Sequence, residues 1–219
     1  MPTTGARPAS ALGSGRLVAR APRVRVGAFP GSFNPPTVAH LAIAEAALDQ
    51  CELDEVRLIV SRVALGKEDV QLPLLEHRLE VLRRVAQSRP WLGVDVTDVQ
   101  LVADIAAGYD VLVLGADKWA QLLDPQFYDG SEEGRDAALA RLPGVAVAPR
   151  PPPPVPAGAH VLAVPVHTAE ASSTGVRQGR RDWMLPEAAE FDEDTGAWTD
   201  PDRYRTWLET APPRTLKGN

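Results

Sequence analysis

Short runs of apolar, mostly β-branched residues alternate along this chain with segments of helical pattern, and this alternation limits the fold more than any other feature. Short apolar runs bounded by turn-forming or charged residues predict buried strands. We expect such strands at Val24–Phe29, Val56–Val60, Gly93–Val96, Val111–Leu114, Val145–Ala148 and Val161–Val164.

The segments between these runs have the spacing of helices. The clearest is Leu74–Gln87, where leucine recurs at helical spacing and gives one apolar face. Further helices are expected at Thr37–Leu48, Lys118–Leu123, Asp136–Leu142 and Asp202–Glu209. Alternating strands and helices imply parallel strands with right-handed crossovers, so the sequence predicts a single α/β domain with a doubly wound, Rossmann-like parallel sheet. In such sheets ligands bind beyond the carboxyl ends of the strands.

Proline, at 21 of 219 residues, is in excess over its usual share, and its positions help to delimit the domain. Residues 1–22 also contain arginine and no acidic residue, which predicts a disordered basic tail; transit peptides share this composition, but glycine and proline interrupt any amphipathic helix here. Pro212 and Pro213 end the folded region. We therefore expect a domain at 23–210 and a C-terminal tail at 211–219.

A third group of prolines, 149, 151–154 and 156, lies between two expected strands. Such a run adopts polyproline II and cannot sit inside a sheet. It is either a segment that docks a partner or a stiff surface loop, and the flanking strands favour the loop.

Charge and cysteine content narrow the classes of partner and compartment. The formal net charge of −6 argues against general nucleic-acid binding, where a basic footprint is expected. The single cysteine, Cys51, cannot form an internal disulfide, and no apolar run approaches the ~20 residues needed to cross a bilayer. We therefore expect a cytoplasmic protein without a membrane partner. Its oligomeric state stays open, and a homo-oligomer is one alternative.

The segment between the first expected strand and the first expected helix has the residues of a phosphate site. Gly31 allows the backbone to approach a phosphate, and Pro36 fits the first turn of a helix, whose N-terminus presents N–H groups to an anion. Thr37 and His40 are three residues apart, so both side chains lie on one face of that turn. A histidine there can donate a hydrogen bond to a phosphate oxygen without acting as a nucleophile. The same residues also occur by chance, as a turn followed by a surface histidine.

The stretch GSFNPPTVAH, from Gly31 to His40, resembles the signature of the nucleotidyltransferase superfamily, in particular of its nicotinate-mononucleotide adenylyltransferases. Those enzymes follow a glycine-rich loop with a motif of His or Thr, any residue, Gly and His. Here alanine, Ala39, stands in the place of the glycine, and its methyl group could crowd a bound nucleotide.

The resemblance implies roles for the residues of this stretch. His40 and Thr37 would act on the α- and β-phosphates of ATP. Backbone groups of the loop would also bind ATP, namely those of Gly31, Ser32 and Phe33.

A glycine and an aspartate follow the fourth expected strand, at Gly115 and Asp117. An aspartate in this place can simply cap a helix, but a carboxylate at a strand end can also accept hydrogen bonds from ribose hydroxyls. The pair resembles the Gly-x-Asp block of the same family, which implies that both residues bind ATP and that Asp117 lies by the ribose.

The stretch SSTGVR, Ser172 to Arg177, follows the last expected strand. Hydroxyls at a helix start can cap the helix or bind a phosphate, and an arginine one turn later offers a fork of donors. The stretch resembles the family's closing motif, Ile-Ser-x-Thr-x-Ile-Arg. The resemblance implies that Ser173, Thr174 and Arg177 hold the triphosphate, with Arg177 counted among the catalytic residues.

The acceptor side of the site matches the family less well, because its Pro-Pro-His-Lys and Ser-Tyr-Thr blocks are absent from the corresponding stretches. Lys67 and Arg150 are candidate phosphate contacts. Trp119, with Phe127 and Tyr128, could stack on a pyridine ring, although aromatic residues beside a strand end are more often core.

Together these motifs imply transfer of AMP from ATP to a phosphorylated acceptor, nicotinate mononucleotide first among them, with release of pyrophosphate and a role in NAD biosynthesis. Mg²⁺ would arrive with ATP, and the remaining histidines lack the spacing of a protein metal site. The alternatives are another adenylyl- or cytidylyltransferase, such as one with a phosphopantetheine acceptor, and a nucleotide-binding module that has lost catalysis. A protein that docks through its polyproline run is a third.

Overall fold

The structure is a computed structural model that describes residues 23–62, 72–149 and 158–210. The expected tails at 1–22 and 211–219 lie outside these ranges, as do most of the proline run and the candidate contacts Lys67 and Arg150. The predictions made for those residues stay predictions.

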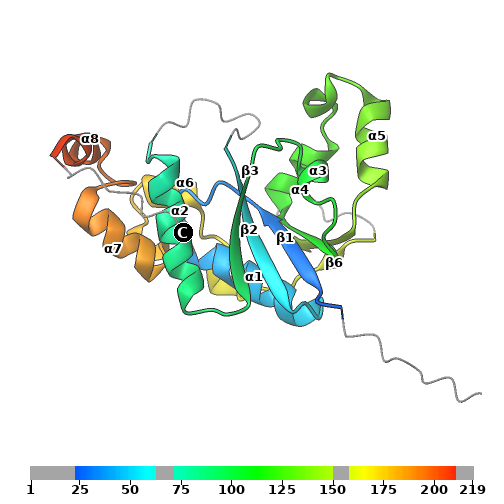
Figure 1. Cartoon of the computed structure of the whole chain (residues 1–219), viewed down its shortest axis with the longest axis horizontal. Coiled ribbons are helices and arrows are strands. Elements are labelled where there is room, and N and C mark those ends of the chain that lie inside the picture. The colour runs from blue at the N-terminus through cyan, green and yellow to red at the C-terminus, as the bar shows by residue number, and fades with distance from the viewer. Residues whose placement is uncertain (1–22, 63–71, 150–157, 211–219) are drawn as a thin grey trace, which may run out of the picture.

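The described chain forms one parallel sheet with the strand order β3-β2-β1-β4-β5-β6 (Figure 1). The strands are β1 Val26–Pro30, β2 Glu55–Ser61, β3 Leu92–Thr97, β4 Val111–Gly115, β5 Gly144–Ala148 and β6 His160–Val161. Every pairing within the sheet is parallel. The predicted doubly wound α/β fold is therefore confirmed.

The last strand is shorter than the sequence predicts and begins one residue earlier. The Leu162 N–H still donates to the Val147 carbonyl at 2.9 Å, but at Ala163 the side chain of Gln50, from the first helix, bonds both backbone groups at 2.9 Å in place of a neighbouring strand. The expected strand Val161–Val164 is corrected to His160–Val161 for this reason.

Eight helices flank the sheet in the described residues, and some were not expected from the sequence. They are α1 Val38–Gln50, α2 Leu75–Gln87, α3 Val102–Ile105, α4 Ala116–Leu123, α5 Glu132–Ala140, α6 Ser173–Arg177, α7 Pro186–Thr195 and α8 Pro201–Thr210. Short 3₁₀ turns are found at Pro125–Tyr128, Val166–Thr168 and Arg181–Trp183. Helix α5 starts earlier than its expected position because the Ser131 hydroxyl caps it, accepting the Gly134 N–H at 2.9 Å. None of the helices in the described ranges is long and apolar enough to cross a membrane.

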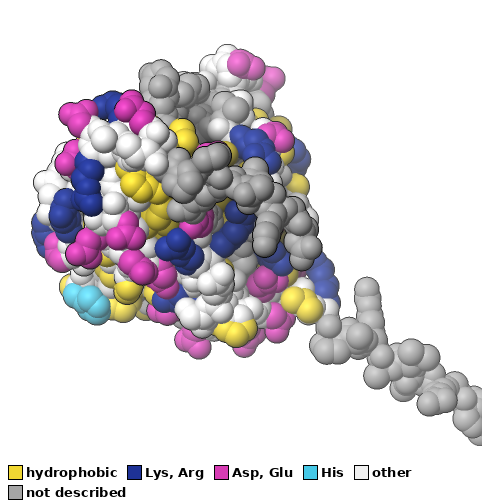
Figure 2. Space-filling view, turned by 60° about the vertical axis from the view of Figure 1, so that its left-hand side comes forward, with side chains coloured by type: hydrophobic (Ala, Val, Ile, Leu, Met, Phe, Trp, Pro, Cys, Tyr) yellow, Lys and Arg dark blue, Asp and Glu magenta, His cyan; other side chains and the backbone are white. Residues whose placement is uncertain are grey.

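The helices form two groups on either side of the sheet's centre. Figure 1 shows α6, α7 and α8 gathered beside α2, and α3, α4 and α5 together on the other side. An aromatic cluster holds the first group together, with Phe191, Trp198 and Tyr204 all nearly fully buried against Val81 of α2. On the face drawn in Figure 2, acidic and basic side chains are interspersed.

The strand order positions a binding site between β1 and β4. The chain leaves β1 toward β2 on one side and leaves β4 toward β5 on the other, while β1 and β4 pair directly, with Gly27 opposite Val111 and Ala28 opposite Leu112. At such a switch point the loops after the two strands diverge and leave a crevice. The two loops that carry the glycine motifs therefore face the same space.

Candidate active site

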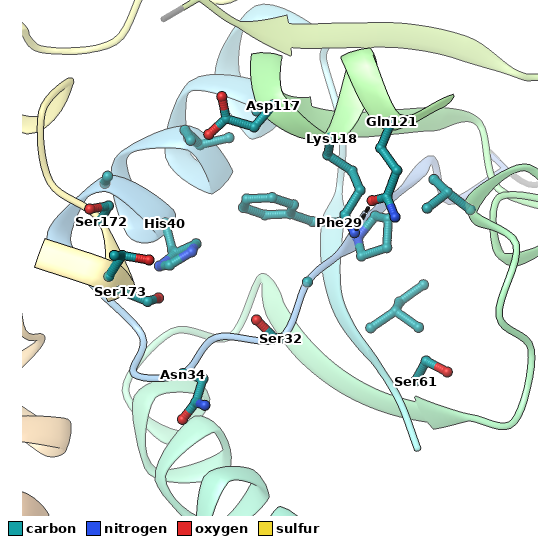
Figure 3. Close-up of a pocket in the computed structure, with 18 of the residues that line it drawn as sticks. Phe29, Ser32, Asn34, His40, Ser61, Asp117, Lys118, Gln121, Ser172 and Ser173 are labelled. Atoms are coloured by element: carbon teal, nitrogen blue, oxygen red, sulfur yellow. Dashed lines mark hydrogen bonds between the residues drawn. The ribbon is translucent and has the colours of Figure 1, made fainter. Parts of the chain in front are cut away.

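A cavity of about 1240 Å³ opens at the carboxyl ends of β1 and β4. Figure 3 shows His40, Ser172 and Ser173 gathered at one side of it, while Asp117, Lys118 and Gln121 enter from α4. Loops that are far apart in the sequence thus supply one wall each, as expected from motifs that each follow a strand.

His40 is held at the start of α1 by the residue that precedes the helix. The backbone N–H of Thr37 donates to His40 Nδ1 at 3.0 Å, and the Thr37 hydroxyl lies 2.8 Å from the same nitrogen. Because a backbone N–H can only donate, Nδ1 must accept, and a neutral ring then carries its proton on Nε2. The Phe33 ring packs edge-on against the imidazole with 5.1 Å between ring centroids. The ring is therefore fixed in both tautomer and orientation.

The geometry corrects the predicted role of Thr37. Its side chain is fully buried and is not part of the cavity wall. The hydroxyl faces His40 because it completes the hydrogen-bonded start of the helix. Thr37 is thus a positioning residue for His40 and not a phosphate contact.

Phe33 is likewise an internal support. It has a left-handed backbone conformation, with φ of 44°, and its ring is 1% exposed. The ring fills the space beside Gly31, where a Cβ atom would lie only 2.8 Å from Phe33 Cζ. Gly31 and Ser32 line the cavity, whereas Phe33 is not among its described lining residues, and its ring has a packing role. The predicted contact of the Phe33 backbone with ATP stays a prediction.

Asn34 connects the β1 loop to two other parts of the chain, and sequence reasoning did not single it out. The indole N–H of Trp198 donates to Asn34 Oδ1 at 2.7 Å, and Arg177 donates to the Asn34 carbonyl. The Trp198 backbone N–H is itself bound by the Asp192 carboxylate at 2.7 Å, in the turn after α7. The loop is therefore fastened both to α6 and to the C-terminal helices.

The closing motif forms α6, whose first residues face the β1 loop. Ser172 caps the helix by accepting the Gly175 N–H at 3.1 Å. Ser173 donates its hydroxyl proton to the Pro35 carbonyl at 2.7 Å, and Thr174 Oγ1 accepts from Arg177 at 3.2 Å. Partial burial lowers the pKa of the Arg177 guanidinium from its ordinary value. Ser173, Thr174 and Arg177 all line the cavity together with His40, as predicted.

The wall formed by the end of β4 and the start of α4 is more open. Gly115 and Asp117 line the cavity as predicted, and the Asp117 side chain is exposed. Lys118, which was not singled out, also lines it and donates to Gln121 at 2.7 Å. Trp119 points the other way, into the core formed with Leu112 and Leu122, and is 9% exposed. Trp119 is therefore corrected from a candidate contact to a core residue, whereas Phe127 and Tyr128 do line the cavity.

The charge of the cavity wall is opposite to that of the whole chain. Among the described residues that line it, Asp117 is the single carboxylate, against His40 and the cations Arg62, Arg78, Lys118, Arg177 and Arg205. A hollow with this balance in a chain of net charge −6 concentrates an anionic ligand. In the parts of the chain that the structure describes, no group of three or more His, Cys, Asp or Glu is placed to hold a metal ion.

Known proteins resemble this chain in sequence and in fold. The model of the cytidylyltransferase-like family matches residues 28–179. A Salinibacter ruber protein named "Probable nicotinate-nucleotide adenylyltransferase" is 32% identical over 188 residues, which cover 78% of this chain and 95% of the relative. A Methylibium petroleiphilum protein of the same name is 29% identical over 71% of this chain and 79% of its own length. The fold is shared with a solved structure, that of Plasmodium falciparum nicotinic acid mononucleotide adenylyltransferase in complex with NaAD. The TM-score is 0.59 at 14% sequence identity, and the match covers 78% of this chain and 96% of that chain.

Proposed function

We propose that this chain, which belongs to the cytidylyltransferase-like family, is a nicotinate-nucleotide adenylyltransferase of NAD biosynthesis. A phosphate oxygen of nicotinate mononucleotide attacks the α-phosphorus of ATP, the bond from that phosphorus to the bridging oxygen breaks, and pyrophosphate leaves. The products are the dinucleotide NaAD and pyrophosphate. The related proteins of Salinibacter ruber and Methylibium petroleiphilum carry this activity in their names.

The observation that carries the proposal is the cationic cavity at the switch point of an otherwise acidic chain. Five Arg and Lys side chains and one carboxylate line it, in the described part of the chain. Two substrates that together bring four phosphate groups need such a surface, because their mutual repulsion must be offset before they can approach each other. An uncharged substrate would not require it.

The chemistry needs alignment and charge stabilisation and no covalent enzyme intermediate. His40, with its proton on Nε2, is the donor to a non-bridging oxygen of the α-phosphate, where negative charge develops. Thr174 and Arg177 hold the β- and γ-phosphates, and the backbone of Gly31 and Ser32 approaches the nucleotide. Ser173, whose hydroxyl proton is donated to the Pro35 carbonyl, fixes the start of α6 against the β1 loop. Asp117, at the end of β4, accepts hydrogen bonds from the ribose of ATP.

Mg²⁺ enters this scheme as part of the nucleotide. The cavity wall has one carboxylate in its described part, which suits an ion carried mainly by phosphate oxygens and water. When bound, the ion neutralises charge on the phosphates. The protein's own residues provide the alignment.

We propose the cytoplasm as the compartment of this reaction, in line with the expectation drawn from Cys51. That thiol is free and half-buried, and burial raises its pKa.

The test is pyrophosphate release by the purified full-length chain with Mg-ATP and a panel of acceptors. The panel contains nicotinate mononucleotide, nicotinamide mononucleotide and phosphopantetheine, with CTP in place of ATP as a second arm. We expect the highest kcat/KM with ATP and nicotinate mononucleotide. Release that is faster with phosphopantetheine, or that needs CTP, would assign the chain to another activity of the family, and ATP binding without turnover on any acceptor would make it a binding module.

A further inference from the structure

We propose that Arg78 binds a phosphate group of the substrates, as a second anion anchor that enters the cavity from α2. This inference rests on the proposed function and deepens it. Neither the sequence motifs nor the comparisons assign a role to this residue. The phosphate belongs either to ATP or to the acceptor mononucleotide, and the experiment below separates the two.

Arg78 is a buried cation without a charged partner in the described part of the chain. It lies in the first turn of α2, lines the cavity and is only 8% exposed. Among the described residues it makes one hydrogen bond, from Nη1 to the carbonyl of Ser32 at 3.2 Å. Its Nε atom is buried and has no hydrogen-bond partner. A guanidinium that is removed from water in this way costs free energy unless an anion or a set of acceptors compensates it.

Two other arginines of the cavity wall each form an ion pair with a carboxylate, which balances their charge. Arg62 is paired with Asp98 at 3.1 Å, and Arg205 with Asp202 at 2.5 Å. Both of these pairs lie at the surface, where their side chains are more than half exposed. Arg78 is more deeply buried than either and lacks the carboxylate.

The hydrogen bond to Ser32 orients the Arg78 side chain but uses only one of its N–H donors. A guanidinium has five N–H donors, and a backbone carbonyl accepts one of them. A neutral amide side chain could support the loop equally well, so support of the loop does not explain a full positive charge. Burial lowers the pKa of Arg78, yet arginine remains charged at neutral pH.

A phosphate group fits the remaining donors. The planar fork of arginine matches two phosphate oxygens at once, and charge-assisted bonds of this kind are among the strongest in proteins. Arg78 reaches the β1 loop at Ser32, and both Ser32 and Gly31 line the cavity in which the substrates would bind. In the described part of the wall the single carboxylate, Asp117, is carried by α4, so it does not compete for this position.

The test compares the binding of ligands with and without a phosphate by calorimetry, using wild type, Arg78→Gln and Arg78→Lys. The ligand pairs are ATP against adenosine, and nicotinate mononucleotide against nicotinate riboside. Arg84→Gln is the matched control, because Arg84 lies on the same helix but pairs with Glu80 outside the cavity wall. The melting temperature of each variant shows whether it is folded, and Arg78→Lys supplies a folded variant if Arg78→Gln is not.

We expect Arg78→Gln to weaken the binding of one phosphorylated ligand about tenfold or more, with its unphosphorylated partner unchanged and an intermediate loss in Arg78→Lys. Loss with ATP places the phosphate in the triphosphate, and loss with nicotinate mononucleotide places it in the acceptor. An equal change for both members of each pair, or no change at all, would overturn the inference and leave Arg78 as a support of the loop. If wild type binds these ligands without turnover, the proposed function fails while the contrast between ligand pairs still reports on Arg78.

Discussion

The loop that follows β1 and the junction of β4 with α4 face the same cavity, yet they are built in opposite ways. The β1 loop is buried and fastened at several points: Asn34 is 5% exposed and bound by Trp198 and Arg177, and Phe33 fills the space beside Gly31. The junction of β4 with α4 is open, since a Cβ atom at Gly115 would meet nothing within 4 Å and Asp117, in the first turn of α4, is exposed.

The difference reflects what each loop has to do. Groups that stabilise developing charge in a transition state act best when they are already fixed, so that they need not reorganise during the reaction. The β1 loop, which orients His40, has this character. A ribose contact only has to form when the substrate binds, and an exposed carboxylate serves for that.

The largest loss of activity is expected when His40, the hydrogen-bond donor that the β1 loop holds in place, is removed. We expect His40→Ala to lower kcat about 10²- to 10³-fold, the usual cost of one donor to a transition-state oxyanion, with a small change in the KM for ATP. Steady-state pyrophosphate release measures both. Thr37→Val keeps the backbone bond to Nδ1 but removes the hydroxyl, so its kcat should fall much less than that of His40→Ala. Turnover that His40→Ala leaves unchanged would remove the mechanism.

Alanine substitutions at Gly31 and Gly115 compare how tightly the chain is packed around each glycine. Gly31→Ala should lower the free energy of unfolding by about 1–3 kcal/mol, because the new methyl group meets the buried Phe33 ring. Gly115→Ala should change it by less than about 0.5 kcal/mol, because the added Cβ enters open space. Urea denaturation measures both values. Equal stability of the two variants would mean that the β1 loop is not tightly packed.

The bond between Trp198 and Asn34 tests whether the C-terminal helices support the β1 loop. Trp198→Phe keeps most of the buried ring but removes the N–H, so we expect a loss of about 1–2 kcal/mol in unfolding free energy and a severalfold lower kcat/KM. The control is Trp91→Phe, since Trp91 precedes β3 at the opposite end of the strands. A stability loss in Trp198→Phe with unchanged kinetics would show that the support does not reach the site.

The smallest effect on activity is expected from substitution of the exposed Asp117. Asp117→Asn should raise the KM for ATP about three- to tenfold, as the loss of charge weakens its bonds to the ribose, while the melting temperature stays within about one degree because the side chain is exposed. Thermal melting and ATP titration of the rate are the measurements. A large fall in stability would show that Asp117 caps α4 structurally instead.

Much of this architecture follows from local sequence. The sheet was predictable because its central strands are continuous apolar runs, and the three motifs were predictable as site residues because each follows a strand end. Helix α7 was missed, since its sequence PEAAEFDEDT is mostly polar and shows no continuous apolar stripe.

The missed site residues depend on contacts between distant parts of the chain. Arg78 lies 46 positions from Ser32, and Trp198 lies 164 positions from Asn34. Nothing in the local pattern of α2 distinguishes Arg78 from an exposed helix arginine, because its environment is created by the packing of the β1 loop. Thr37 was misassigned for a related reason. Its spacing from His40 places both side chains on one face of the turn, but spacing does not tell which of them faces the cavity.

The position of bond cleavage tests the central claim most directly. The full-length chain is incubated with nicotinate mononucleotide and ATP that carries a radiolabel on either the α- or the γ-phosphate, and the products are separated. The account predicts that the α-label appears in NaAD and the γ-label in pyrophosphate, in equal molar amounts. A γ-label on the acceptor, or an α-label that stays in ADP or AMP, would contradict adenylyl transfer.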